Sequence, residues 1–156
     1  MGDLHVGFGF DVHPSDPTRE LWLGGVLFPG EAGLAGHSDG DAVCHALADA
    51  LLGAAALGDL GERFPEDDPG FEGIRGLDLL RRTVDLVREA GWSPGSCDVT
   101  IVCDRPSIAP QRGAIRAALA DAVGSEVDRV SVKATRPEGL GLTGDGVGCF
   151  AVATLR

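Results

Sequence analysis

The order of the apolar segments along the chain constrains its fold more than any other feature of the sequence. Apolar residues alternate in strand fashion near the start, recur at helical spacing through the middle, and return to strand patterns at the end. The expected order is strand, strand, helix, helix, strand, helix, strand, strand. Because a doubly wound fold alternates regularly, this order instead predicts an α+β fold whose mixed sheet has helices packed on one face.

Length and charge narrow the class of protein. The 156 residues fit one domain, expected over 1–156, since domains usually hold ~100–200 residues. The formal net charge of −11 argues against nucleic acid and anionic membranes as partners. It leaves room for a phosphorylated substrate, because a bound divalent cation can invert the local field.

Nothing in the sequence predicts a membrane or secreted protein. The longest apolar runs fall short of the ~18–20 residues of a membrane span, and Met1 to His5 lacks the basic and apolar regions of a secretory signal. Cys44 and Cys103 sit among apolar neighbours, as buried thiols do in a reducing compartment. We therefore expect a cytoplasmic protein.

The segments can be placed by residue number. Strands are expected at 4–12, 98–103, 129–135 and 148–155, and Leu21 to Phe28 is expected to form a hairpin partner around Gly24-Gly25. Helices are expected from an N-cap at Ser38 or Asp39 to about Ala56, and over 74–90 and 110–123. The first helix has an apolar stripe of Val43, Leu47, Leu51 and Ala54.

Asp11 and His13 are the first candidate site residues. Residues two apart in a strand project to the same face, so this carboxylate and imidazole can converge on one point. Gly7 and Gly9 on that face leave room for something bulky. The alternative is that Asp11 only ends the strand by accepting backbone hydrogen bonds.

The segment from Gly36 to His45 is the second candidate. Asp41, His45 and Asp49 form a polar row at a spacing of four, in which His45 is expected to face outward. Two histidines and one aspartate can hold a tetrahedral zinc ion with its fourth position open. Asp41 and Asp49 could orient the His45 ring, or Asp41 could be a solvated helix cap, and Ser38 could be only a cap.

Gly139 to Gly144 matches the dinucleotide-binding pattern G-x-G-x-x-G by spacing alone. That motif requires a following helix and an acidic residue about 20 positions later. Only 12 residues follow Gly144, and they have a strand pattern. We therefore do not expect a dinucleotide site.

Several motifs together resemble the 2-C-methyl-D-erythritol 2,4-cyclodiphosphate synthase family nearly end to end. They are Gly9-Phe10-Asp11-Val12-His13-Pro14, Gly36-His37-Ser38-Asp39-Gly40-Asp41 with His45 to Ala54, Leu57-Gly58-Asp59-Leu60-Gly61 with Phe64-Pro65, Arg105-Pro106, Lys133-Ala134-Thr135 and Glu138 to Gly144. The resemblance implies release of CMP from 4-diphosphocytidyl-2-C-methyl-D-erythritol 2-phosphate, as its 2-phosphate attacks the β-phosphate to form 2-C-methyl-D-erythritol 2,4-cyclodiphosphate. It also implies a homotrimer with sheets facing the threefold axis and active sites shared between subunits.

The same resemblance implies the site residues. Asp11, His13 and His45 would bind one zinc ion per chain, and Glu138 a second ion, Mg²⁺ or Mn²⁺, on the substrate diphosphate. His37, Arg136 and Glu138 would be catalytic. Asp59 to Gly61 and Phe64 to Asp68 would line the methylerythritol side, and Cys103 to Ala109 the cytosine pocket. The substrate-binding set is Asp11, His13, His37, Ser38, Asp59, Leu60, Gly61, Phe64, Pro65, Glu66, Asp67, Asp68, Cys103, Asp104, Arg105, Pro106, Ser107, Ile108, Ala109, Thr135, Arg136, Pro137, Glu138, Leu142 and Asp145.

Some positions depart from the family pattern. Arg136 and Pro137 replace two threonines, Asp145 replaces an arginine, and Ser107 replaces a frequent lysine. Arg136 could neutralise phosphate charge by a different geometry or block the pocket, so we expect slower turnover than is typical. Two other functions stay open: a non-catalytic trimeric binder of nucleotides or isoprenoid phosphates, and a metal-dependent nucleoside-diphosphate hydrolase.

Overall fold

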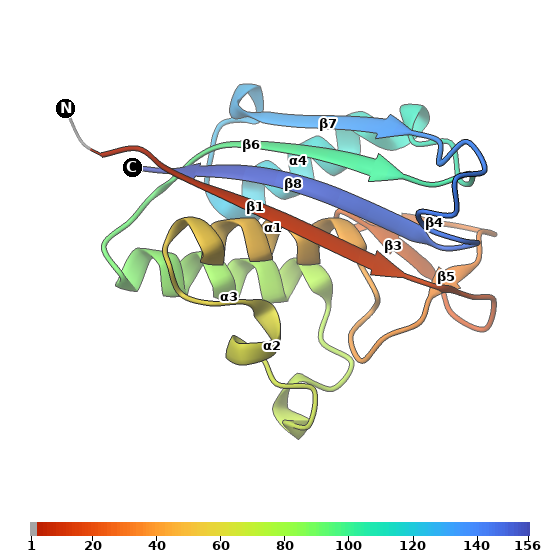
Figure 1. The fold of residues 1–156 in the computed structure, drawn as a ribbon, viewed down its shortest axis with the longest axis horizontal. Coiled ribbons are helices and arrows are strands. Elements are labelled where there is room, and N and C mark those ends of the chain that lie inside the picture. The colour runs from red at the N-terminus through yellow and green to blue at the C-terminus, as the bar shows by residue number, and fades with distance from the viewer. Residues whose placement is uncertain (1–2) are drawn as a thin grey trace.

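Four strands form the main sheet of the computed structural model, which describes residues 3–156 (Figure 1). In spatial order they are β1 (His5–His13), β8 (Val147–Leu155), β6 (Pro94–Val102) and β7 (Val130–Thr135). β8 pairs antiparallel with both β1 and β6, whereas β6 and β7 are parallel. Parallel neighbours need a long crossover, and α4 (Arg112–Val123) lies in it. The predicted mixed sheet is confirmed.

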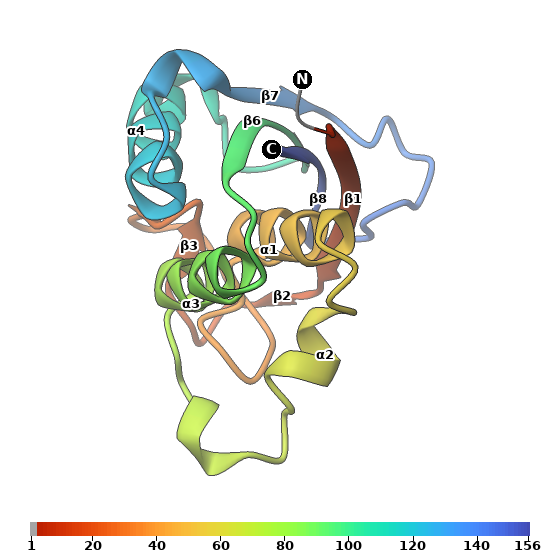
Figure 2. The same cartoon turned by 90° about the vertical axis from the view of Figure 1, so that its left-hand side faces the viewer.

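Three helices lie on one side of this sheet, as expected (Figure 2). α1 (Ala42–Ala54) packs under β1 and β8, α3 (Gly76–Glu89) packs against α1, and α4 packs against α3 and β7. Since α1 lies between the sheet and α3, it is buried all round except at Asp49 and Gly53. The expected stripe on α1 is therefore correct but too narrow.

The segment from Leu21 to Phe28 turns at Gly24-Gly25 as expected, but it does not pair with β1, so its expected role as a partner of the first strand is wrong. It folds on itself as β3 (Leu21–Leu23) and β4 (Val26–Phe28), around Gly24-Gly25 with φ of 59° and 77°. Two consecutive positive φ values are the requirement of a tight hairpin turn. β1 instead pairs with β8 over nine residues, from His5 opposite Leu155 to His13 opposite Val147. A strand of three residues could offer β1 only a third of that pairing.

The remaining elements are short. A two-residue strand, β2 (Ser15–Asp16), pairs with β5 (Gly33–Leu34). The segment 58–73, for which the sequence gives neither helix nor strand, contains α2 (Leu60–Arg63) and a 3₁₀ turn. Other 3₁₀ turns span 109–111 and 127–129.

Gly7 and Gly9 let β1 lie directly on α1. A Cβ built at Gly9 would be 1.9 Å from the carbonyl oxygen of Ala46, and one at Gly7 would be 1.9 Å from that of Ala50. Gly7 and Gly9 are two strand residues apart, about 6.8 Å, and Ala46 and Ala50 are four helix residues apart, about 6 Å. The two close contacts therefore occur at matching positions along β1 and α1. The bulky group that these glycines accommodate is therefore the helix backbone.

The other face of the sheet is apolar and uncovered in the single chain. Val6 and Phe8 are 61% and 63% exposed, and Phe10, Val12 and Val152 are about 40% exposed. Rings of Phe8 and Phe10 contact Phe150 across the β1–β8 pair. We call this patch the outer apolar face.

Two further findings concern membrane and thiol predictions. Among residues 3–156, no helix is both long enough and apolar enough to cross a bilayer. All four cysteines are free and buried, which confirms the prediction for Cys44 and Cys103.

Candidate metal centre and adjoining cavities

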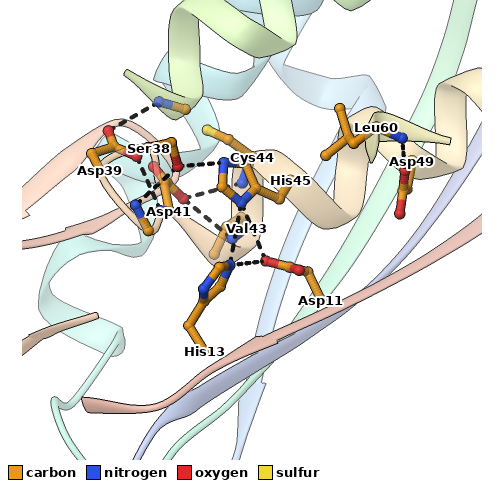
Figure 3. A network of polar contacts seen from close by, with 12 residues as sticks. Asp11, His13, Ser38, Asp39, Asp41, Val43, Cys44, His45, Asp49 and Leu60 are labelled. Atoms are coloured by element: carbon orange, nitrogen blue, oxygen red, sulfur yellow. Dashed lines mark hydrogen bonds and ion pairs between the residues drawn. The ribbon is translucent and has the colours of Figure 1, made fainter. Parts of the chain in front are cut away.

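Asp11, His13 and His45 meet where the end of β1 passes the start of α1 (Figure 3). We call these three residues the metal group. Asp11 Oδ2 lies 2.7 Å from His13 Nε2 and 3.3 Å from His45 Nδ1, and the two nitrogens are 3.3 Å apart. Tetrahedral ligands at bond lengths of about 2.05 Å are about 3.3 Å from one another. Two of the three distances match this spacing, and the distance from Asp11 to His13 would have to lengthen by about 0.6 Å for one zinc ion to bond all three atoms.

The contacts behind each imidazole direct the remaining nitrogen toward Asp11. His13 Nδ1 donates to the carbonyl of Ala35 at 2.7 Å, so Nε2 faces the group. His45 Nε2 lies 3.0 Å from Ser38 Oγ, so Nδ1 faces it. Metal-binding histidines normally have such a partner on the other ring nitrogen. The expectation that His45 faces outward is wrong, because its side chain is buried against β1.

Burial and protonation also fit a cation at this point. Asp11 Oδ2 is buried and accepts no well-aligned hydrogen bond. Burial raises the pKa of the Asp11 carboxyl, but contacts with His13 and His45 outweigh it and lower the pKa to about 2. Contact with Asp11 raises the pKa of His13 despite burial. Without a metal ion the Asp11 carboxylate therefore favours a proton on His13, and a divalent cation would take the place of that proton.

Asp41 supports the site from behind and does not orient His45. It is the N-cap of α1, in place of the expected Ser38 or Asp39. Its carboxylate is fully buried and accepts from the backbone N–H of Val43, Cys44, Gly24 and Gly25. Burial raises the pKa of Asp41. The predicted solvated cap is therefore a buried one that ties α1 to the β3–β4 turn.

Asp49 likewise makes no contact that would orient the His45 ring. It accepts from the backbone N–H of Leu60 at 2.8 Å, and burial raises its pKa. This bond fixes the start of α2 beside the metal group. Ser38 has the orienting role that the sequence assigned to Asp41 and Asp49.

A cavity of about 270 Å³ opens from the metal group. It has a polar end at the three ligand residues and an apolar wall in which Phe64 meets Phe71 edge to face at 5.3 Å. The predicted residues that line it are Asp11, His13, His37, Ser38, His45, Leu60, Gly61, Phe64, Pro65 and Glu66. The sequence did not identify Asp49, Phe71, Ile74 and Leu79 as lining residues. Phe71 and Ile74 flank a loop, where no periodicity marks an inward side chain.

A second cavity, of about 220 Å³, lies at the ends of β6 and β7. Its predicted lining residues are Cys103, Asp104, Pro106, Ser107, Ile108, Ala109, Thr135 and Arg136, and the sequence missed Arg112 and Ala134. The two cavities share no residue. β1 and β7 are the two edges of the sheet, three strand spacings or roughly 14 Å apart.

The other predicted site residues lie elsewhere. Asp59 and Asp68 cap α2 and the 3₁₀ turn at Pro69–Phe71. Arg105 pairs with Glu31 at 3.2 Å and lines a third cavity with Asp145. The residues that line neither of the first two cavities are Asp59, Asp67, Asp68, Arg105, Pro137, Glu138, Leu142 and Asp145. Glu138 is exposed, with φ of 53°, in the connection between β7 and β8.

Comparison with known proteins identifies the family. A model described as the YgbB family matches residues 4–156. The chain belongs to this family. It is 49% identical over 152 residues to a protein of Trichlorobacter lovleyi named 2-C-methyl-D-erythritol 2,4-cyclodiphosphate synthase, with 97% of each chain covered.

Solved structures of relatives have the same fold. One is a 2C-methyl-D-erythritol-2,4-cyclodiphosphate synthase in its CDP-bound form, with a TM-score of 0.90 and 37% identity over 97% of this chain and 99% of that one. Another is the bifunctional IspDF of Campylobacter jejuni, with a TM-score of 0.92 and 36% identity over 98% of this chain and 42% of that one. Membership of the YgbB family agrees with the resemblance found in the sequence.

Proposed function

We propose that this chain is a 2-C-methyl-D-erythritol 2,4-cyclodiphosphate synthase of non-mevalonate isoprenoid biosynthesis. It converts 4-diphosphocytidyl-2-C-methyl-D-erythritol 2-phosphate to the cyclic diphosphate. An oxygen of the 2-phosphate attacks the β-phosphorus, and the bond from that phosphorus to the oxygen of CMP breaks, so that CMP departs with the electron pair. The observation that supports this proposal best is the convergence of Asp11, His13 and His45 beside a cavity.

The metal group and its cavity suit this substrate. Asp11, His13 and His45 would hold zinc, which would supply Lewis-acid stabilisation of the phosphate charge. Ser38 orients His45, and His37 lines the cavity, where it would contact the substrate. The apolar wall at Phe64 would accept the methylerythritol carbon chain. Positioning and charge neutralisation are the main demands of phosphoryl transfer, and these residues provide both.

We propose that the second cavity binds the cytidine part of the substrate, and that Arg136 and Glu138 act beside it. Arg136 lines this cavity, so its guanidinium can neutralise phosphate charge there. Glu138, two residues further on, would hold Mg²⁺ or Mn²⁺ on the diphosphate. A cytoplasmic location agrees with four free thiols, which persist in reducing compartments.

We propose a homotrimer in which these two halves of the active site come from neighbouring subunits. Within one chain the metal group and the second cavity lie toward opposite edges of the sheet. The outer apolar face, exposed at Val6, Phe8 and Phe10, would be covered if three sheets faced a common axis. Light scattering of the purified protein tests the mass of three chains.

The function is tested by incubating the purified protein with the cytidylyl substrate and following CMP and the phosphorylated product by ³¹P NMR. We expect CMP and a cyclic diphosphate, about one zinc per chain, and loss of both zinc and turnover in His45→Ala. His5→Ala is the matched control, because His5 lies at the far end of β1 and contacts Ala54 and Trp92.

Other outcomes would support the alternatives. A linear phosphorylated product would indicate a metal-dependent nucleoside-diphosphate hydrolase. Tight binding of CDP without any release of CMP would indicate a non-catalytic binding protein. Either result contradicts the proposed function.

A further inference from the structure

Four consecutive backbone carbonyls, those of residues 35–38, each accept a hydrogen bond from another segment. This run carries His37 and Ser38 into the metal-side cavity. The donors to carbonyls 35, 36, 37 and 38 are, in order, His13 Nδ1, Arg19 Nη1, the backbone N–H of Gly73, and Arg19 Nη2. Each residue has only two soft backbone dihedral angles, φ and ψ. Hydrogen bonds to the carbonyls of His37 and of both its neighbours therefore largely determine the backbone conformation of His37.

Within the described part of the chain, Arg19 is the one side chain that holds the run on both sides of His37. Its Nη1 donates to the carbonyl of Gly36 at 2.8 Å, and its Nη2 donates to that of Ser38. Arg19 is itself fixed, because its backbone N–H donates to Asp16 at 3.2 Å and its carbonyl accepts from Gly33 at 2.9 Å. Among residues 3–156 it makes no ion pair with a carboxylate, so the guanidinium is committed to these two carbonyls.

We infer that Arg19 is a positioning residue for His37 and Ser38, an inference that rests on the proposed function. Two donors held in one rigid plane fix the orientation of two peptide groups, whereas a lysine ammonium offers a single flexible point. The Ser38 end of this run contacts the His45 ring, and the His37 side chain faces the cavity. Loss of Arg19 therefore leaves all the reacting groups present but misplaces His37.

The test compares Arg19→Ala and Arg19→Lys with Arg116→Lys. Arg116 is the matched control, because it is also partly buried and donates to a backbone carbonyl, that of Val130 at 2.6 Å, but it lies in α4 away from the cavity. We expect kcat to fall about 10- to 100-fold in Arg19→Ala, the loss typical of a small misplacement of reacting groups. Arg19→Lys is expected to lie between Arg19→Ala and the unaltered protein, and Arg116→Lys to match the unaltered protein. Zinc content is expected to stay at about one per chain, because the bond from His13 to Ala35 does not involve Arg19.

A second readout does not depend on activity. The chain has four histidines, so the ring Cε1–H signals of His5, His13, His37 and His45 can be resolved and assigned in an NMR spectrum. In Arg19→Ala the His37 signal is expected to broaden or shift most, the His45 signal to shift less through Ser38, and the His5 signal, at the far end of β1, to stay unchanged. If the unaltered protein releases no CMP, the proposed function fails, and this spectrum still decides whether Arg19 positions His37.

Two results would overturn the inference. One is an unchanged kcat and an unchanged His37 signal in Arg19→Ala. The other is loss of zinc and kcat in equal proportion together with shifts of all four histidine signals, which would show that Arg19 only stabilises the fold.

Discussion

Replacing Gly9 by alanine should separate the metal ligands by moving a helix. The new Cβ would lie 1.9 Å from the carbonyl oxygen of Ala46 and 2.8 Å from the nitrogen of Ala50. Carbon and oxygen normally approach no closer than about 3.3 Å, so α1 must move away from β1 by about 1.4 Å. Such overpacking usually costs about 1–3 kcal/mol of the free energy of unfolding.

The same movement can be followed to the metal group, since Ala46 is the neighbour of His45. Asp11 and His13 stay together on β1, but each 3.3 Å distance to His45 Nδ1 would grow to about 4.7 Å. That exceeds twice a zinc–nitrogen bond of about 2.1 Å, so one ion could no longer bond all three residues. We expect zinc affinity, measured by competition with a chromophoric chelator, to fall at least about 100-fold.

Gly53→Ala is the matched control for this experiment. Gly53 also lies along the contact of α1 with β1, but an added Cβ would meet only the carbonyl oxygen of Phe8, at 4.0 Å. Because alanine favours a helix, we expect this variant to be up to about 1 kcal/mol more stable, with unchanged zinc affinity. Zinc binding by Gly9→Ala at the unaltered affinity would falsify the reasoning.

Three further predictions concern protonation, burial and the altered residues near the second cavity. Zinc affinity should fall as pH drops through the raised pKa of His13, above its usual 6.5, because protons compete for its ring; the measurement is a zinc titration between pH 5 and 8. Asp41→Ala should lower the free energy of unfolding, measured in urea, by about 3–5 kcal/mol, since buried N–H groups lose their acceptor. The control Asp121→Ala should lower it by at most about 1 kcal/mol, because the ion pair of Asp121 with Arg81 is exposed. Replacing both Arg136 and Pro137 by threonine should raise kcat in the CMP-release assay, and no gain would count against an impairment by these two residues.

The pH prediction has a counterpart in the metal-free protein. The carboxyl of Asp11 has a lowered pKa, so its contribution to stability is present above its ordinary value of 3.8 and is lost as pH falls toward about 2. The raised pKa of His13 works in the other sense, so its contribution is complete below 6.5 and is lost as pH rises through the raised value. Urea unfolding of metal-free Asp11→Asn should therefore differ most from that of the unaltered protein between about pH 4 and 6.5.

The sequence predicted those features that depend on local periodicity. The expected helix at 74–90 corresponds to α3, in which Leu80, Val84 and Val87 are buried, and the expected strand at 4–12 corresponds to β1. The fold class followed from the order of such segments, because each must cover an apolar face. Asp11 and His13 were recognised as neighbours because a strand places residues two apart on the same side.

The features it missed depend on contacts between distant segments. Ser38, Asp39 and Asp41 are all good N-cap residues, and what distinguishes Asp41 is the turn at Gly24-Gly25, whose N–H groups need a buried acceptor. The bonds from Arg19 across the loop leave no local pattern for the same reason. Helical spacing gave the row that contains His45, but which side of α1 faces solvent was set by the packing of both the sheet and α3.

The separation of the two cavities has a genetic consequence in the proposed trimer. A chain with His45→Ala loses the metal half that it gives to one site but keeps the cytidine half that it gives to another, and a chain with Ala134→Trp keeps its metal half while its second cavity is filled. Each should be inert alone, yet chains coexpressed in equal amounts should recover about a quarter of the normal turnover, since each half is intact with a probability of about one half. Such complementation between two dead alleles cannot arise if each polypeptide completes its own site, so mixtures that stay inactive would point to self-sufficient chains.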